Sequence, residues 1–108
     1  MTPMAKKNTL KELNKIAYNL CYSNPEKSFD LAQEAAIIAS VEENKEEFAL
    51  AKTTMAYAGQ SLGLLAEAYE NAMFALKYFK EVQNDEKISF LYNTLGFIYY
   101  YLGNTEKR

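Results

Sequence analysis

Hydrophobic and small side chains recur along this chain at spacings of three and four residues. The pattern i, i+3, i+4, i+7 occurs three times, as Leu13, Ile16, Ala17 and Leu20; as Met55, Ala58, Gly59 and Leu62; and as Tyr92, Leu95, Gly96 and Tyr99. This spacing places the four side chains of each set on one face of an α-helix. Because the set returns, the sequence predicts an internal repeat built from stacked helical hairpins.

The breaks in this pattern predict five helices, over residues 6–22, 25–41, 46–64, 67–82 and 87–102. The clearest start is at Asn24-Pro25-Glu26, since Asn is a good N-cap, Pro suits the first helical position and Glu complements the helix dipole. We interpret the acidic run over residues 42–47 as a solvated turn rather than a cation site. Gly103 with Asn104 predicts a helix end, after which residues 105–108 would begin another helix.

Alignment of the sets predicts a register for the repeat. The first-helix sets are shifted by 42 and then by 37 residues, and a shift of 44 aligns Ser28, Ala32 and Ala35 with Ala72, Leu76 and Phe79. The expected organisation is one domain spanning residues 1–108. It has repeat 1 at 6–42, repeat 2 at 44–82, and the first helix and turn of a truncated repeat 3 at 85–108.

Composition narrows the class of protein. A chain of 108 residues that is 49% hydrophobic and 24% charged fits one globular domain. The net charge is -2 and the basic residues are scattered, so we expect no nucleic-acid partner. No segment has the length and apolarity of a signal peptide or a membrane span. We therefore expect no membrane association and a cytoplasmic location.

The sequence offers little for catalysis. It contains no histidine, which is the commonest general base and zinc ligand. Its paired carboxylates fall at predicted helix ends, where solvent would leave their acidity unchanged. The sole cysteine, Cys21, is interpreted as a small buried hydrophobe. We expect no enzymatic activity, no catalytic residues, no metal and no cofactor.

Two segments carry a resemblance to a known family. Residues 92–104, with an aromatic residue, Leu95-Gly96, Tyr99 and a turn glycine, resemble the first helix of a tetratricopeptide repeat. Residues 69–72 with Leu76 resemble the start of its second helix, and residues 24–28 with the following alanines do so more weakly. The chain departs from that family at Ser28 and Phe79, where the family prefers Ala. The period of this chain also exceeds the 34 residues that are common in the family. The alternative is an ordinary five-helix bundle.

The resemblance implies an all-α, short right-handed superhelix of about five helices whose first helices line a concave surface. That surface would bind a peptide or a partner domain, as a scaffold within a larger regulatory or signalling protein. The concave positions that the resemblance implies are Lys11, Asn14, Tyr18, Tyr22, Thr53, Gln60, Phe90, Asn93, Phe97 and Tyr100, together with Ala56, Leu64 and Tyr101. Packing of the aromatic residues and plain solvent exposure of the amides remain the alternatives. A carboxylate clamp is not predicted.

The third copy of the pattern suggests a second surface. If repeat 3 lacks its partner helix, then Tyr92, Leu95, Tyr99 and Leu102 lie on a face that another element should cover. Burying each such side chain is worth about 1.5–3 kcal/mol. We therefore expect the isolated chain to form a homo-oligomer through this face. The alternative function is accordingly a structural oligomerisation module.

Overall fold

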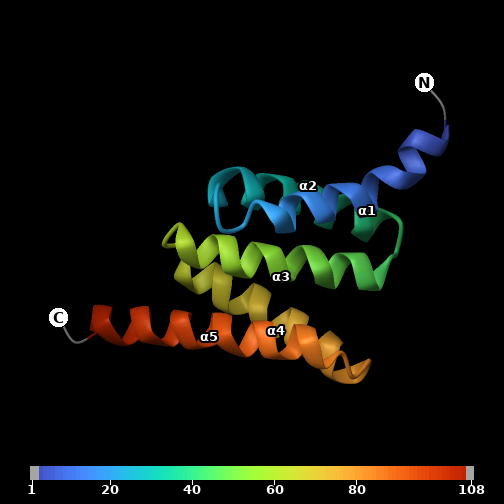
Figure 1. The fold of residues 1–108 in the computed structure, drawn as a ribbon. Coiled ribbons are helices and arrows are strands. Elements are labelled where there is room, and N and C mark those ends of the chain that lie inside the picture. The colour runs from blue at the N-terminus through green and yellow to red at the C-terminus, as the bar shows by residue number, and fades with distance from the viewer. Residues whose placement is uncertain (1–2, 107–108) are drawn as a thin grey trace.

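The computed structural model describes the backbone of residues 3–106 and the side chains of residues 9–103. Five α-helices follow one another in this part of the chain, so the prediction of an all-α fold is confirmed (Figure 1). Consecutive helices pack as antiparallel neighbours. The helices are α1 (Pro3–Asn19), α2 (Pro25–Val41), α3 (Lys45–Ser61), α4 (Leu65–Glu81) and α5 (Asp85–Glu106).

The helices form two layers. Helices α1, α3 and α5 run in the same direction, with α2 and α4 behind them in Figure 1. Within residues 3–106, α1 contacts α3 and α3 contacts α5, whereas α2 and α4 do not contact each other. Helix α3 contacts α1 and α5 in its own layer and α2 and α4 in the other layer. It is therefore enclosed by four helices.

Three-residue loops join the last four helices. Asn44 caps α3 by accepting a hydrogen bond from the backbone N–H of Glu47 at 3.1 Å. Asn84 caps α5 through Lys87 N–H at 3.1 Å, and Asn24 caps α2 in the same way. At the equivalent place before α4, Leu64 supplies no side-chain cap. The predicted start at Asn24-Pro25-Glu26 is therefore confirmed.

Each of these loops also contains one residue with left-handed backbone. Their φ angles are 56° at Glu43, 84° at Gly63 and 58° at Gln83. The next residue donates its N–H to the carbonyl five residues earlier, which satisfies an orphan acceptor at the helix end. These bonds are Asn44 to Ala39 at 2.9 Å, Leu64 to Gly59 at 2.8 Å and Asn84 to Phe79 at 2.9 Å.

The structural repeat is 40 residues long. Helix α2 begins at Pro25 and α4 at Leu65, while α3 begins at Lys45 and α5 at Asp85. The predicted shifts of 44 and 37 are wrong, because they matched apolar patterns without the loop positions. The shift of 42 from α1 to α3 holds at the helix ends, Asn19 and Ser61. The connection from α1 to α2, residues 20–24, is two residues longer than the connection from α3 to α4, residues 62–64.

The 40-residue register changes the equivalent positions. Buried residues at matching places in α2 and α4 are Ser28 with Ala68, Ala32 with Ala72, Ala35 with Ala75, Ala36 with Leu76, and Ala39 with Phe79. In the same register Gly96 corresponds to Ala56, not to Gly59. The third pattern of the sequence was therefore aligned three residues out of step.

The end of α5 also differs from the prediction. This helix continues through Gly103 to Glu106, so no helix ends at Gly103 and no new one begins at residue 105. The physical reason is backbone conformation, since the one glycine with positive φ among the described residues is Gly63. Residues 107–108, which the sequence assigned to repeat 3, lie outside the described residues.

Small residues bring the paired helices close together. Ser28 Oγ donates to the carbonyl of Ala17 at 2.6 Å where α1 crosses α2. Where α3 crosses α4, a Cβ added to Gly59 would lie 3.5 Å from the Ala68 side chain. In α1 the buried line is Leu10, Asn14 and Ala17, and it continues into the following connection at Cys21, which confirms a buried Cys21. Ile16 was expected inside but is 50% exposed.

Candidate binding surface

A cavity of about 350 Å³ opens on the layer formed by α1, α3 and α5. Its position follows from the two layers, because α3 lies between the other two helices and forms the floor. Three lysines and one glutamate line it, so positive side chains outnumber negative ones. The lining residues are Lys11, Asn14, Lys15, Tyr18, Glu47, Leu50, Thr54 and Lys87.

A buried amide and a buried carboxylate join α1 to α3 at this cavity. Asn14 Nδ2 donates to Glu47 Oε1 at 2.8 Å and to the Glu47 carbonyl at 3.0 Å. Both side chains are more than nine-tenths buried. Within the described residues Asn14 Oδ1 has no hydrogen-bond partner. A buried acceptor left in this state costs about 1–3 kcal/mol.

Aromatic rings continue the surface beyond the cavity. The ring of Phe90 on α5 lies 5.7 Å from Tyr18 and 5.8 Å from Tyr57, and Tyr22 lies 4.9 Å from Tyr57, measured between centroids. Lys87 Nζ lies 4.5 Å from the centroid of the Tyr18 ring. We name Tyr18, Tyr22, Tyr57 and Phe90 the aromatic cluster. Contacts of this kind hold α1, α3 and α5 at fixed separations.

Burial perturbs the titration of groups in and beside this cluster. Partial burial, with smaller effects from Tyr22 and Cys21, raises the pKa of Tyr18. Burial and the same neighbours also raise the pKa of Tyr57. Burial likewise raises the pKa of the Cys21 thiol, although a backbone hydrogen bond and Lys87 oppose the shift. The shifts therefore move the titration of all three groups further into the alkaline range.

The structure distributes the predicted concave residues among three environments. Lys11, Asn14 and Tyr18 line the cavity, and Tyr22 and Phe90 lie in the aromatic cluster. Thr53 is 1% exposed and bonds the Ala49 carbonyl of its own helix, while Gln60 is 9% exposed and donates to Ser61 Oγ. The exposed members on α5 are Asn93, Phe97 and Tyr100.

Several residues at this surface were not predicted. They are Lys15, Glu47, Leu50, Thr54, Tyr57 and Lys87. On α3 the difference is one residue of helical phase, since Thr54 rather than Thr53 lies at the cavity. The two further concave positions expected near α3 differ as well: Ala56 is fully buried, and Leu64 lies in the loop after α3. The Asn44 cap, which fixes where α3 begins, was the signal that could have set this phase.

The residues predicted for self-association also differ from one another in burial. Leu95 is 4% exposed and belongs to the core, and Leu102 packs against that core. Tyr92 and Tyr99 are 50% and 55% exposed. A hydrogen bond with Tyr69 raises the pKa of Tyr99. The uncovered face of α5 is therefore rotated away from the two leucines.

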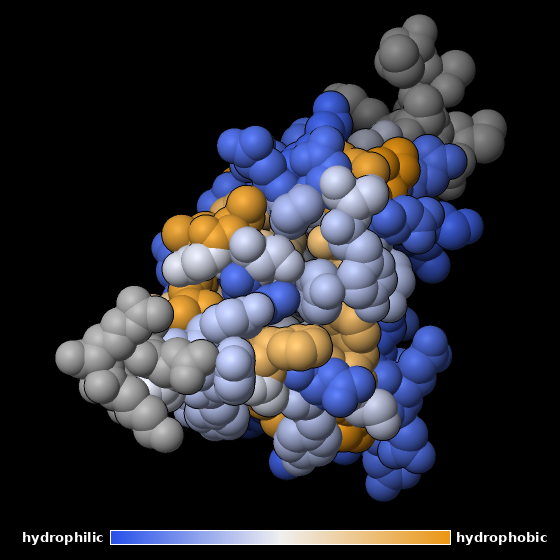
Figure 2. Space-filling view, turned by 60° about the vertical axis from the view of Figure 1, so that its left-hand side comes forward, coloured by the Kyte–Doolittle hydropathy of each residue, from blue (hydrophilic) through white to orange (hydrophobic). Residues whose placement is uncertain are grey.

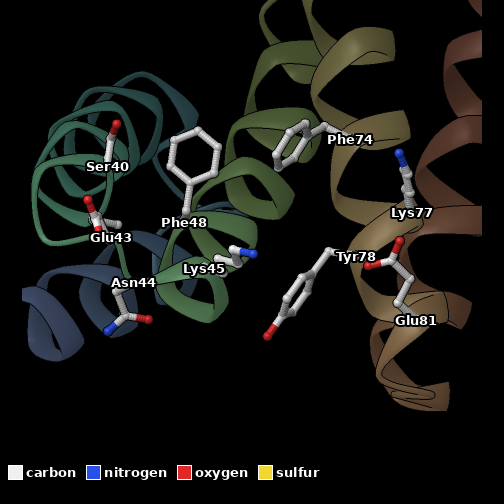
Figure 3. Close-up of a pocket in the computed structure, with 10 residues that line it drawn as sticks. Ser40, Glu43, Asn44, Lys45, Phe48, Phe74, Lys77, Tyr78 and Glu81 are labelled. Atoms are coloured by element: carbon white, nitrogen blue, oxygen red, sulfur yellow. The ribbon is translucent and has the colours of Figure 1, made fainter.

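The second layer holds another cavity, of about 360 Å³, where α2 and α4 spread apart (Figure 3). Its walls carry Phe48 and Phe74, whose ring centroids are 5.3 Å apart. Two lysines and two glutamates line it, so its charge is balanced. The lining residues are Ala39, Ser40, Glu43, Asn44, Lys45, Phe48, Phe74, Lys77, Tyr78 and Glu81.

Comparisons with known proteins add no identity. No family model, no curated protein and no solved structure matches this chain. Among the described residues, no helix is both long and apolar enough to cross a membrane. Over the same residues, no three His, Cys, Asp or Glu side chains are grouped as a metal site would require.

Proposed function

We propose that this chain is a tetratricopeptide-type stack of helical hairpins that binds an acidic peptide segment across α1, α3 and α5. The observation that carries the proposal is one cavity with three lysines, beside a cluster of four aromatic rings. The layer in contact would form the inner side of the stack, as expected for such repeats. A regulatory or scaffolding role within a larger protein follows from the same resemblance.

The chemistry of the cavity favours an acidic segment over a basic one. Lys11, Lys15 and Lys87 surround it, whereas the carboxylate of Glu47 is already held by Asn14. Carboxylates on the peptide would make charge-assisted hydrogen bonds with the lysines. The second cavity lacks this excess of positive charge.

The aromatic cluster supplies the apolar part of the site. Tyr22 is 67% exposed and its ring packs on Tyr57, so its outer face is available to a ligand. Aromatic side chains give large contact area for little conformational entropy. We therefore expect the peptide to carry an apolar residue next to its acidic residues.

Selection from a display library of random linear peptides tests the proposal. The enriched peptides should combine Asp or Glu with an apolar residue, and their affinity should fall as salt rises. Lys87→Gln and Lys15→Gln should each weaken the best peptide about tenfold, because each removes a charged contact. Isothermal titration calorimetry measures the change.

Lys27→Gln is the matched control, since Lys27 is exposed on α2 and lines neither cavity. It should leave the affinity unchanged. Equal weakening by the control and by the cavity variants would contradict the proposed site. Enrichment of basic peptides would contradict the proposed chemistry.

A further inference from the structure

Helix α5 itself supplies no charged side chain to its outer face, although Lys80 of α4 places its Nζ 5.5 Å from the centroid of the Tyr92 ring. The sequence contains no Asp, Glu, Lys or Arg between Ile88 and Gly103. Four aromatic residues in this stretch are about half exposed or more: Tyr92 at 50%, Phe97 at 49%, Tyr99 at 55% and Tyr100 at 63%. The exposed faces of α2 and α4, by contrast, carry several charged residues each. An aromatic face of this extent indicates an interaction surface.

The repeat register shows what kind of surface this is. Positions 49, 53, 56 and 60 of α3 are buried, and Ala49 and Ala56 belong to the core shared with α4 and α5. Forty residues later the same positions on α5 are Ser89, Asn93, Gly96 and Tyr100, and all four are exposed. The α5 face is therefore the counterpart of a face that receives neighbouring helices.

No contact within a single chain requires a glycine at position 96. It lies in the middle of α5, where glycine costs about 1 kcal/mol relative to alanine. A Cβ added at Gly96 would meet nothing within 4 Å, and the same holds for Gly103. A glycine at such a place would let the backbone of another molecule approach the helix closely.

The residues around Gly96 are arranged symmetrically along the helix. Tyr92 and Tyr100 lie four residues before and after it, and Ser89 and Gly103 lie seven before and after. A two-fold axis at Gly96 would thus place Tyr92 of one copy opposite Tyr100 of the other. The two tyrosine pairs would flank the crossing at Gly96, and Ser89 would lie opposite Gly103, which is the self-complementarity that a two-fold interface requires.

The available area is also sufficient. Aromatic side chains each offer about 150–250 Å², so the four exposed rings contribute roughly 400 Å² per chain. Two chains together would withdraw about 800 Å² from the rings alone. The intervening Ser89, Asn93 and glycine backbone would bring the total to roughly 1,000 Å², which is the lower limit for a biological interface.

We infer that two copies of this chain pair through α5, with the two antiparallel helices crossing at Gly96. The pairing is independent of the peptide site, which lies on the side of α5 that faces α3. Because α5 contributes no charged side chain, we expect the pairing to depend less on salt than the proposed peptide binding does. The rings of Tyr92 and Tyr100 are the central contacts.

Sedimentation velocity of the 108-residue chain from about 1 μM to about 500 μM tests the inference. We expect a monomer–dimer equilibrium within that range. Gly96→Gln, which places a long side chain at the crossing, should raise the dissociation constant by about tenfold or more. The same variant should raise the thermal stability of the monomer, because glutamine is the better helix former.

Ala66→Gln is the matched control, since Ala66 is also an exposed small helical residue but lies on α4. It should dimerise like the natural chain. If Gly96→Gln does not fold by circular dichroism, Tyr100→Lys carries the test, because it adds a charge to the same face. A monomer at every concentration would overturn the inference, as would a dimer that folded Gly96→Gln or Tyr100→Lys leaves intact.

Discussion

Two loop residues, Glu43 and Gln83, hold a backbone conformation that glycine holds at Gly63 in the equivalent loop. Left-handed backbone costs a residue with a Cβ about 1–2 kcal/mol, so the loops tolerate strain at these two positions. The strain persists because each loop closes with a hydrogen bond to the preceding helix. A search for glycine in the sequence finds one of these three loops and misses the other two.

Glu43→Gly and Gln83→Gly should each raise the free energy of unfolding by about 0.5–1 kcal/mol. Glycine relieves the left-handed strain and gives back part of the gain through its greater freedom in the unfolded chain. Gly63→Ala should lower it by about 1 kcal/mol for the opposite reason. Urea denaturation measures all three. A stabilising Gly63→Ala would show that these loops are not equivalent.

Burial of Tyr18 and Tyr57 should make the fold sensitive to alkaline pH. Their pKa values are raised in the folded chain above the ordinary 10.0, so the unfolded chain releases these protons first. The resulting stability is complete below pH about 10 and is lost as pH rises through the folded pKa values. Thermal denaturation should show a falling midpoint above pH about 10. The Tyr18→Phe, Tyr57→Phe double variant should fall less steeply, and an unchanged slope would contradict this account.

The element that repeats is a 17-residue helix followed by a three-residue loop, from α2 to the start of α5. Asn24 was recognised in the sequence as a helix start because an N-cap has a local mechanism, and Asn44 and Asn84 cap α3 and α5 by the same mechanism. Apolar spacing did not predict the register. Helix α3 is buried on nearly every side, so several sets of its residues show the same helical spacing. The helix that packs on four others is the one whose phase the sequence predicts least well.

Loss of an N-cap should destabilise the whole helix that it begins. Asn84→Ala removes the acceptor for Lys87 N–H and should lower the free energy of unfolding by about 1 kcal/mol. Asn84→Ser retains an acceptor of similar capping strength and should stay close to the natural chain. Guanidinium denaturation measures the difference. Equal stability of the two variants would mean that the cap contributes nothing.

At the scale of the whole molecule, different faces carry different surfaces. Figure 2 shows one side on which side chains of intermediate hydropathy gather across the middle, with strongly hydrophilic ones mostly toward the edges. Lysines and aromatic rings meet where α1, α3 and α5 are in contact, and uncharged rings cover the outer face of α5. We therefore expect peptide binding at the first surface to weaken more with salt than pairing through α5 does.

The sequence indicated part of the candidate site. Lys11, Asn14 and Tyr18 were predicted and line the cavity, because spacings of three and four residues place them on one face of α1. The bond from Asn14 to Glu47 could not be predicted, since it joins residues 33 positions apart and depends on how α1 meets α3. Glu47 was expected in a solvated turn and is instead buried.

The most direct test of the central claim is to map the selected acidic peptide on the isotopically labelled chain by NMR. The account predicts that amide shifts change at Lys15, Tyr18, Thr54 and Lys87, which span α1, α3 and α5. Shift changes confined to Phe48, Phe74 and their neighbours in the second cavity would place the peptide between α2 and α4. That result would contradict the proposed binding surface.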